Sequence, residues 1–391
     1  MKRVLKTMPL MLTMLLMSAC SANANQVTTP AAAEQPKVAA EQKAGVSLSD
    51  ISGHWAEPDI KAIVAAGYID GYPDGSFKPD HTVTRAEFMT MTAKAAGLKA
   101  EPVQGNSEWY APYVAALVEA GIHQYKDFTT GDWNTPITRM EMARLAVRAS
   151  DKTLQAPEDN TDAKKFMFLA TQKGLITGMA DGQLGKEESA TRAQSVKIIQ
   201  RILDVSQGKK LEVDKRAASY AEVELTGSNV QTMWGGHVVE LPYKMPLEKT
   251  TATVKVHQVL IMDLKEKDGA FRSTFEGKLE KVDGKPIGKD DYLVALNLKI
   301  TNETKAPLTY TLWGQLAPVT GSMRVNIVDV NGEVDNRFFI PGIGASDFAP
   351  DGWYFFVLPR EQVQDQMKKY GYASLRMYEN NGAEFDLAKK E

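Results

Sequence analysis

The sequence has little cysteine: Cys20 is the only one among its 391 residues. A single cysteine excludes an intramolecular disulfide, a cysteine-ligated zinc site and an iron–sulfur cluster. Histidine is also scarce, with five residues, and no two of them form a His-x-x-x-His pair. A helix-borne catalytic metal site of that type is therefore not expected. We predict no metal and no cofactor.

The chain also lacks an excess of basic residues, since its formal net charge is −3. Sequence-independent binding of nucleic acid requires a clustered basic face, so we expect no nucleic-acid partner. From about residue 215 onward the chain has no Gly-x-Ser-x-Gly elbow, no phosphate-binding loop and no dinucleotide-binding glycine motif. We predict no catalytic residues and expect that the protein is not an enzyme.

One short apolar run stands at the start of the chain. Residues 1–6 include three basic side chains, an apolar run covers 8–17, and the small residues Ser18 and Ala19 follow. This order is typical of a secretory signal peptide, which we place at 1–19. About 10 apolar residues are too few for a permanent membrane-spanning helix, which needs roughly 20. We therefore expect an extracytoplasmic protein.

The cysteine lies directly after this segment. Met17-Ser18-Ala19-Cys20 resembles a bacterial lipobox, although leucine stands one position early, at Leu16. The resemblance implies that Cys20 carries lipid and anchors the protein to a membrane. The alternative is cleavage after Ala24, which would release the protein. Residues 20–46 are rich in Ala, Gln, Thr and Pro and predict a disordered tether behind the lipidated cysteine.

Three segments of the chain repeat one pattern, in which a glycine is followed 17 residues later by Thr-Arg. The pairs are Gly67 with Thr84-Arg85, Gly121 with Thr138-Arg139, and Gly174 with Thr191-Arg192. Apolar residues at i, i+3 and i+4 precede each glycine and predict an amphipathic helix, and a second apolar stretch follows each threonine. We place three helix–loop–helix repeats at 47–100, 101–154 and 155–208. None is large enough to bury its own apolar face, so we expect a shared core.

Each Thr-Arg pair begins a capping box, Thr-x-x-Glu in two copies and Thr-x-x-Gln in the third. The box places Arg85, Arg139 and Arg192 in the first turn of a helix, where the helix dipole disfavours a cation. Three arginines in this register predict an anion-binding site made of exposed N–H groups and a guanidinium. The alternative is a structural ion pair between each arginine and a nearby Asp or Glu.

The repeats resemble S-layer homology (SLH) domains. The first copy carries Trp55-Ala56, the run 67–77 and Thr84-Arg85-Ala86-Glu87, whereas the third lacks the tryptophan and has Gln194 in place of the glutamate. The resemblance implies an all-α, pseudo-threefold spindle of three repeats. It also implies grooves that bind an anionic, often pyruvylated, cell-wall polysaccharide through Arg85, Arg139 and Arg192. Whether the third groove functions is left open.

Two further features of the repeats have alternative interpretations. Trp55 and Trp109 could stack on sugars, but a tryptophan that opens an amphipathic helix is more often part of the core, and we expect that here. Asp70, Asp74 and Asp80 lie beside glycines and could indicate a calcium loop. Since the Asp-x-Asp-x-Asp-Gly spacing is absent, we expect ordinary turns.

After a linker at 209–221, the pattern changes to alternating strands, and 222–391 predicts an all-β immunoglobulin-like sandwich. The strands are expected at 253–259, 292–300, 324–330, 353–358 and 374–378, with one helical stretch at 360–369. Turn signals stand at Asp283-Gly284, Asn331-Gly332, Asp351-Gly352 and Asn381-Gly382. The run 292–304 resembles bacterial extracellular immunoglobulin-like lipoprotein modules. His237 and His257 are expected to be surface or packing residues.

The sequence therefore predicts a non-catalytic cell-envelope protein that binds wall polysaccharide through its repeats and displays a β domain. Two alternatives remain open: an enzyme with an unrecognised site in 215–391, and a sensor lipoprotein whose β domain binds a small molecule or a protein. A cleft with perturbed acids would favour the enzyme. An exposed apolar patch or sheet edge would favour a protein partner.

Overall fold

The computed structural model describes most of the chain from residue 48 onward. The described residues are 48–105, 108–128, 131–155, 161–180, 182–246, 252–275, 281–282, 285–286, 290–302, 308–310, 317–318, 326–328, 338–340, 352–378 and 384–390. They all belong to one compact unit, Ala40–Glu391. The predicted signal peptide, Cys20 and the tether lie outside them, as do Asp351 and the other three turn signals. Across the described residues, no helix has the length and apolarity to cross a membrane.

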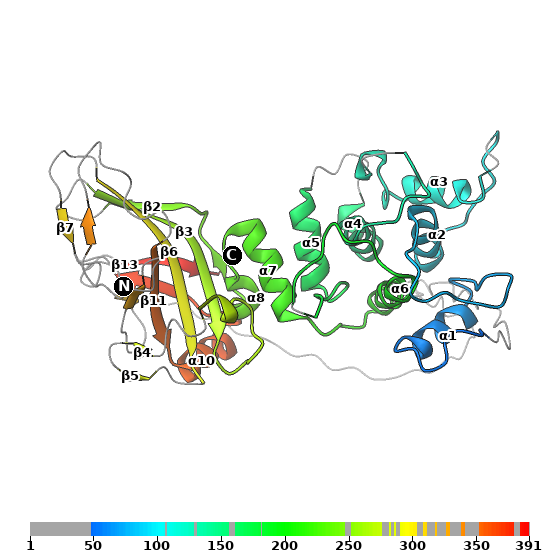
Figure 1. Cartoon of the computed structure of the whole chain (residues 1–391). Helices are drawn as coiled ribbons and strands as arrows, with labels where there is room; N and C mark the ends of the chain where they lie inside the picture. Colours follow the sequence, from blue (N-terminus) through cyan, green and yellow to red (C-terminus); the bar gives the residue numbers. More distant parts are fainter. Residues whose placement is uncertain are drawn as a thin grey trace, which may run out of the picture. The chain divides into compact units, whose positions relative to one another are not determined.

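The repeats consist of paired helices, as predicted (Figure 1). The first helices are α1 (Glu57–Ala65), α3 (Ala111–Glu119) and α5 (Ala163–Gln172), and the second helices are α2 (Arg85–Ala95), α4 (Arg139–Ser150) and α6 (Arg192–Ser206). Two short 3₁₀ turns lie at Tyr125–Asp127 and Lys152–Leu154. After α3, Gly121 has a φ of +70°, and a Cβ there would lie 2.8 Å from the backbone of Gln155. Glycine is required because the chain turns and approaches a second segment at the same point.

The repeats share one core, which confirms the prediction. The first helix of a repeat packs on the second helix of the one before it, α3 on α2 and α5 on α4, and α1 packs on α6. The second helices α2, α4 and α6 also contact one another. The apolar faces meet in a single cluster that includes Ile60, Phe88, Leu145 and Ile199, all nearly inaccessible to solvent. The contact of α1 with α6 closes the series, so each repeat depends on both others for burial.

The segment predicted as a linker contains a helix. Helix α7 (Lys215–Thr226) packs on α5, and its Ala217 and Ala221 belong to the helical core. It starts at Asp214, whose side chain accepts a hydrogen bond from the backbone N–H of Ala217 at 3.0 Å. It ends at Gly227, which has a φ of +80°. The short helix α8 (Val230–Trp234) follows.

The C-terminal part folds into antiparallel sheets. The larger sheet has the order β2-β3-β6-β11-β9, and the second has the order β1-β13-β12-β8. Strands of the larger sheet are β2 (Tyr243–Pro246), β3 (Ala252–Asp263), β6 (Tyr292–Asn302), β9 (Asn326–Val328) and β11 (Gly352–Leu358). Those of the second are β1 (His237–Val238), β8 (Ala317–Pro318), β12 (Leu375–Tyr378) and β13 (Glu384–Lys389). Strand β7 (Leu308–Tyr310) pairs with β10 (Phe338–Ile340), and β4 (Lys281–Val282) pairs with β5 (Lys285–Pro286).

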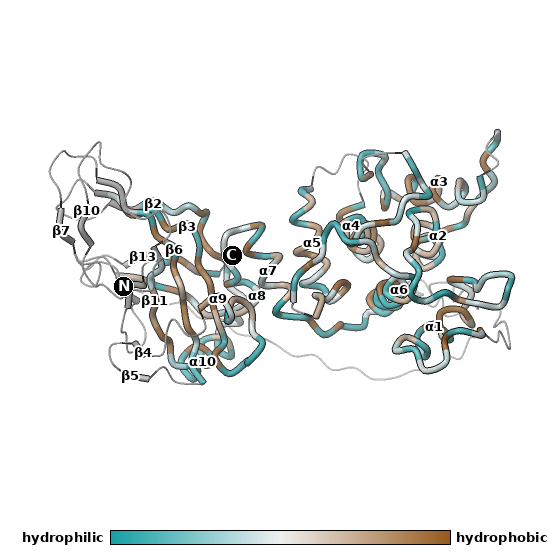
Figure 2. The backbone as a smooth tube through the Cα atoms, in the orientation of Figure 1, coloured by the Kyte–Doolittle hydropathy of each residue, from teal (hydrophilic) through white to brown (hydrophobic). Residues whose placement is uncertain are grey.

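Side chains from both sheets meet in one core. Ile261 of β3, Met377 of β12 and Leu387 of β13 belong to the same buried cluster. Hydrophobic stretches run along β3, β6 and β11 (Figure 2). All five predicted strands coincide with strands of the structure within the described residues, and the predicted helical stretch is α10 (Arg360–Tyr370). The prediction of an all-β domain missed α8 and α9 (Arg272–Phe275).

Candidate functional site

The second helix of each repeat starts at the predicted capping box. The Thr84 hydroxyl accepts from the Glu87 N–H at 3.2 Å, and the Glu87 carboxylate accepts from the Thr84 N–H at 2.8 Å. The same reciprocal bonds join Thr138 to Glu141 and Thr191 to Gln194. The boxes therefore fix where each arginine enters its helix.

The backbone N–H groups of these helix starts are not exposed. Those of Arg85 and Ala86 donate to the carbonyl oxygens of Thr135 and Trp133, in the second repeat, at 3.0 Å each. Equivalent pairs join Arg139 to Glu188, Met140 to Lys186, Arg192 to His81 and Ala193 to Pro79. The expectation of exposed N–H groups is therefore wrong, because the loop of a neighbouring repeat satisfies them.

Two of the three arginines form ion pairs between repeats. The Arg85 guanidinium pairs with Glu141 of the second repeat, Nη2 to Oε1 at 2.5 Å, and the Arg192 guanidinium pairs with Glu87 of the first, Nη1 to Oε1 at 3.0 Å. Each partner is the glutamate of a capping box. The ion-pair alternative is thus what the structure has at Arg85 and Arg192. Their role in polysaccharide binding stays a prediction.

Arg139 lacks such a partner because its repeat neighbour carries Gln194 in the glutamate position. Its Nε donates to the Leu184 carbonyl at 2.8 Å and its Nη2 to the Thr177 carbonyl at 2.6 Å. No carboxylate of the described residues pairs with it, although only 8% of the residue is exposed. Burial lowers the pKa of the Arg139 guanidinium, and Glu188 only partly offsets this. The charge of Arg139 is therefore less compensated than those of the other two arginines.

A groove of about 200 Å³ lies beside Arg192, and all three repeats contribute to its walls. Its lining consists of Tyr68, Ile69, Asp70, Gly71, Tyr72, Pro73, Glu87, Thr90, Met91, Lys94, Trp109 and Arg192. The Lys94 ammonium lies 3.5 Å from the Asp70 carboxylate, and the guanidinium of Arg192 lies over the Tyr72 ring at 4.7 Å. The groove combines aromatic rings with charges of both signs.

Both tryptophans of the helix starts are exposed, against the expectation that they lie in the core. Trp109 is 55% exposed and lines the groove, and Trp55 is 59% exposed. The apolar stripes of α1 and α3 are buried, but the tryptophans are not part of them, because each tryptophan stands before the first helical residue. Their rings are available to contact a ligand.

In the second repeat, the loop equivalent to the one that lines the groove contains a buried cluster of charged side chains. The Asp127 carboxylate lies 2.5 Å from Nη1 of Arg148, which takes the place of Lys94, and 3.5 Å from Nδ1 of His123. Burial raises the pKa of Asp127, but the nearby His123 ring and the hydrogen bonds from the Gln124 N–H and from Arg148 outweigh it. The pKa therefore lies below its ordinary value. This cluster stabilises the loop and leaves less polar surface for a ligand.

The loop aspartates behave as turn residues where their contacts are described. Asp74 accepts from the N–H of Ser76 at 2.9 Å and from its hydroxyl at 2.6 Å. Asp80 contacts His54 at 3.3 Å. In the part of the chain that the structure describes, no group of three or more His, Cys, Asp or Glu residues is placed to hold a metal ion.

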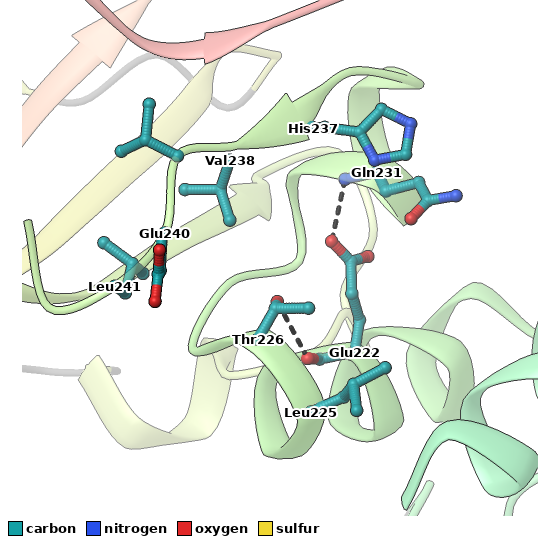
Figure 3. A pocket seen from close by; sticks show the side chains of 9 residues that line it. Glu222, Leu225, Thr226, Gln231, His237, Val238, Glu240 and Leu241 are labelled. Carbon is teal, nitrogen blue, oxygen red and sulfur yellow. Dashed lines mark hydrogen bonds between the residues drawn. The ribbon is translucent and has the colours of Figure 1, made fainter. Parts of the chain in front are cut away.

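A second cavity of about 280 Å³ lies where α7, α8 and β1 meet (Figure 3). Glu222 lies at its wall and is only 2% exposed. Burial raises the pKa of Glu222 to about 7, because hydrogen bonds from Thr232 and Gln231 offset only part of the cost of burying its charge. Sequence reasoning did not find this acid, since it stands directly after the predicted linker 209–221, at the first residue of the predicted β domain, where no motif marks it.

Residues 47–89 match the family model of the S-layer homology domain. They include α1, the loop that lines the groove and the first turn of α2 with its capping box. This part of the chain is an S-layer homology domain. The match holds the residues on which the resemblance was based, Trp55, the run 67–77 and Thr84 to Glu87.

Similar curated proteins include surface-layer proteins and several enzymes. The chain is 31% identical over 183 residues to Exoglucanase XynX of Acetivibrio thermocellus, covering 42% of this chain and 17% of the relative. It is 31% identical over 176 residues to S-layer protein sap of Bacillus anthracis, covering 40% and 21%. It is 26% identical over 250 residues to an S-layer protein of Bacillus thuringiensis subsp. finitimus, covering 56% and 30%. The chain thus spans less than a third of each of these relatives.

The residues that sequence reasoning missed in the repeats are mostly partners of those it found. Glu87 and Glu141 were recognised as caps but not as the carboxylates that pair with Arg192 and Arg85. The sequence did carry a signal for these ion pairs, because an arginine and a glutamate recur together in repeats that share one core. Lys94 carried no signal, because an exposed lysine on a helix is common.

Proposed function

We propose that the protein is a non-catalytic cell-envelope protein whose repeats bind an anionic, pyruvylated cell-wall polysaccharide and whose C-terminal region is displayed at the surface. The observation that carries the proposal is the groove beside Arg192, whose lining comes mainly from the S-layer homology domain. Several relatives are named as S-layer or surface-layer proteins, which supports a location at the cell surface.

The groove has the chemistry of a sugar site. An exposed ring such as that of Trp109 offers a flat apolar face to the C–H groups of a sugar, and Tyr68 and Tyr72 add further rings. Asp70 and Lys94 can hydrogen-bond hydroxyl groups at the rim. We infer that this groove takes the sugar ring of a repeating unit.

Arg139 is the arginine best suited to an anion. Arg85 and Arg192 already face carboxylates, whereas the place of the carboxylate beside Arg139 is taken by the neutral Gln194. A pyruvyl carboxylate would supply the missing charge in a charge-assisted hydrogen bond. The third repeat has the most divergent pattern, and its Gln194 leaves the charge of Arg139 for an external anion to compensate.

The finer architecture is part of the proposal. The closed series of contacts, α3 on α2, α5 on α4 and α1 on α6, supports a pseudo-threefold spindle. The core shared by two antiparallel sheets supports an immunoglobulin-like sandwich. A lipid on Cys20 would hold this assembly at a membrane through the tether 20–46, within reach of the wall.

The test is co-sedimentation of the full chain with purified wall sacculi. We expect the protein to sediment with intact sacculi and to stay in solution after the non-peptidoglycan polymer has been extracted. Equal sedimentation with extracted sacculi would contradict the proposal. Mass spectrometry of the membrane-bound protein tests the lipid separately, and an N-terminus at Asn25 would contradict lipidation.

A second candidate is a ligand-binding lipoprotein, or a wall-anchored enzyme, that uses the C-terminal region. The cavity at Glu222 favours it, because a buried carboxyl with a raised pKa is unusual outside binding or catalytic sites. Residues arranged for a named reaction do not accompany Glu222 among those that line the cavity, so ligand binding is the form of this alternative that we pursue.

A further inference from the structure

The cavity beside α7 has walls of two kinds. It is lined by Glu222, Leu225, Thr226, Gln231, His237, Val238, Val239, Glu240 and Leu241. Its aliphatic side chains include Leu225, Val238 and Leu241, and its acidic side chains are Glu222 and Glu240. Figure 3 shows Leu241 beside Glu240, and Leu225 on the helix that carries Glu222. Among these nine residues there is no lysine or arginine. Both full charges of the lining are therefore negative.

Glu222 is held in place by backbone bonds and still has acceptor capacity. Its two carboxylate oxygens accept from the N–H groups of Gln231 and Thr232, at 2.8 and 2.7 Å. Each carboxylate oxygen has a second lone-pair direction, so the carboxylate can accept further hydrogen bonds. These contacts fix the carboxylate against the start of α8 without supplying a cation.

We propose that this cavity binds a primary ammonium group carried on a short aliphatic stem. The ammonium lies between Glu222 and Glu240, and the stem lies against Leu225, Val238 and Leu241. The proposal concerns the C-terminal region and does not depend on polysaccharide binding by the repeats.

The alternatives fit the cavity less well. An anionic ligand would meet two carboxylates, and a purely apolar ligand would leave the buried Glu222 without a partner of opposite charge. Small-molecule pockets usually span about 300–1,000 Å³, so a cavity of about 280 Å³ favours a small ligand or a single side chain. A free amine and the lysine side chain of a peptide share this chemistry.

Protonation gives the binding a characteristic pH dependence. The pKa of Glu222 is about 7, so the side chain gains its charge as the pH rises through that value. An alkylammonium group keeps its proton over the same range, because its pKa is close to that of lysine, about 10.4. His237 and Glu240 are the other titratable side chains that line the cavity. Affinity for the amine should therefore rise between pH 6 and pH 8.

The experiment is calorimetric titration of the full chain with pentylamine and, as its uncharged counterpart, pentan-1-ol. We expect saturable binding of pentylamine that is at least tenfold tighter at pH 8 than at pH 6, and at least tenfold weaker binding of pentan-1-ol. Glu240→Gln, at an exposed position, should weaken pentylamine binding about tenfold without change in the melting temperature. Glu361→Gln, an exposed acid on α10 outside the cavity, is the matched control and should bind as wild type.

Two further arms complete the test. Glu222→Gln should abolish binding at pH 8, and Glu240→Gln keeps the proposal testable if that variant does not fold. The peptide acetyl-Ala-Lys-Ala-amide, compared with its norleucine counterpart, identifies the source: binding of the lysine peptide alone indicates a lysine side chain, and binding of pentylamine alone indicates a free amine. Equal binding of pentylamine and pentan-1-ol, or binding unaffected by Glu240→Gln and Glu222→Gln, overturns the proposal.

Discussion

At the scale of single residues, the same arginine has different surroundings in each repeat. Arg85 and Arg192 each face a carboxylate from another repeat. The guanidinium of Arg139 donates to two backbone carbonyls instead, and the equivalent capping-box position of the third repeat is the neutral Gln194. All three are almost fully buried. A buried charge needs compensation, so these arginines contribute to the fold wherever the carboxylate is present. Where it is absent, beside Arg139, we propose that an external anion takes its place.

Arg85→Ala tests the structural part of this account. The change leaves the buried Glu141 without its cation, so the free energy of unfolding should fall by about 3–5 kcal/mol. This differs from the sequence-based hypothesis of a purely anion-binding arginine, which predicts nearly unchanged stability. Urea unfolding followed by circular dichroism measures the change. A loss below about 1 kcal/mol would show that the pair contributes little.

Gln194→Glu restores the carboxylate that the third repeat lacks. Glutamate can keep the capping box with Thr191 and can pair with Arg139 as Glu141 pairs with Arg85. We expect the free energy of unfolding to rise by about 1 kcal/mol, since the pair is only partly exposed. Gln104→Glu, a change of the same type at an exposed position before α3, is the control for added charge. Equal effects of the two substitutions would contradict the pairing.

Trp109→Ala tests the groove. The ring is 55% exposed, so its removal should leave the melting temperature nearly unchanged. Loss of an aromatic contact with the ligand should weaken polysaccharide binding about tenfold. Tyr370→Ala removes an aromatic side chain of similar exposure from α10, outside the groove, and should bind as wild type. Unchanged binding by Trp109→Ala would exclude the ring from the site.

At the scale of elements, the sequence predicted those helices whose ends carry strong signals. Thr84, Thr138 and Thr191 mark the starts of α2, α4 and α6 because a hydroxyl cap and a Glu or Gln three residues later act locally. Helix α7 was missed because its apolar residues are mostly alanines, which give a weak stripe. What stabilises it is contact with α5, and the sequence alone does not reveal a contact between distant segments.

The loop of the second repeat should respond to acid. The pKa of Asp127 is lowered in the folded protein, so its contribution to stability is present above the unfolded pKa, near 3.9, and is lost as the pH falls through the folded value. Asp127→Asn should therefore destabilise the repeats at pH 7, where it leaves His123 and Arg148 without the carboxylate. The difference from wild type should shrink below pH 4. Urea midpoints between pH 3 and pH 7 measure it, and a difference that does not depend on pH would contradict this role.

At the scale of the whole molecule, the chain combines interlocked helical repeats with a C-terminal region of antiparallel sheets. Periodicity predicted both parts, because the spacing of apolar residues changes from helical to alternating near residue 215. The site was predicted only in part. The register of the repeats located Arg85, Arg139 and Arg192. The pairing of Glu87 and Glu141 with arginines of other repeats, and the exposure of Trp109, depend on how the repeats pack.

The most direct test of the account is the affinity of the full chain for purified wall polysaccharide, measured by calorimetry before and after removal of the pyruvyl groups. Wild-type protein should lose at least tenfold in affinity when the carboxylates are removed, because Arg139 then has no anion to bind. Gln194→Glu should bind the intact polymer about tenfold more weakly and should lose little more when the pyruvyl groups are removed. Equal affinity of the wild type for both polymers would contradict the anion site.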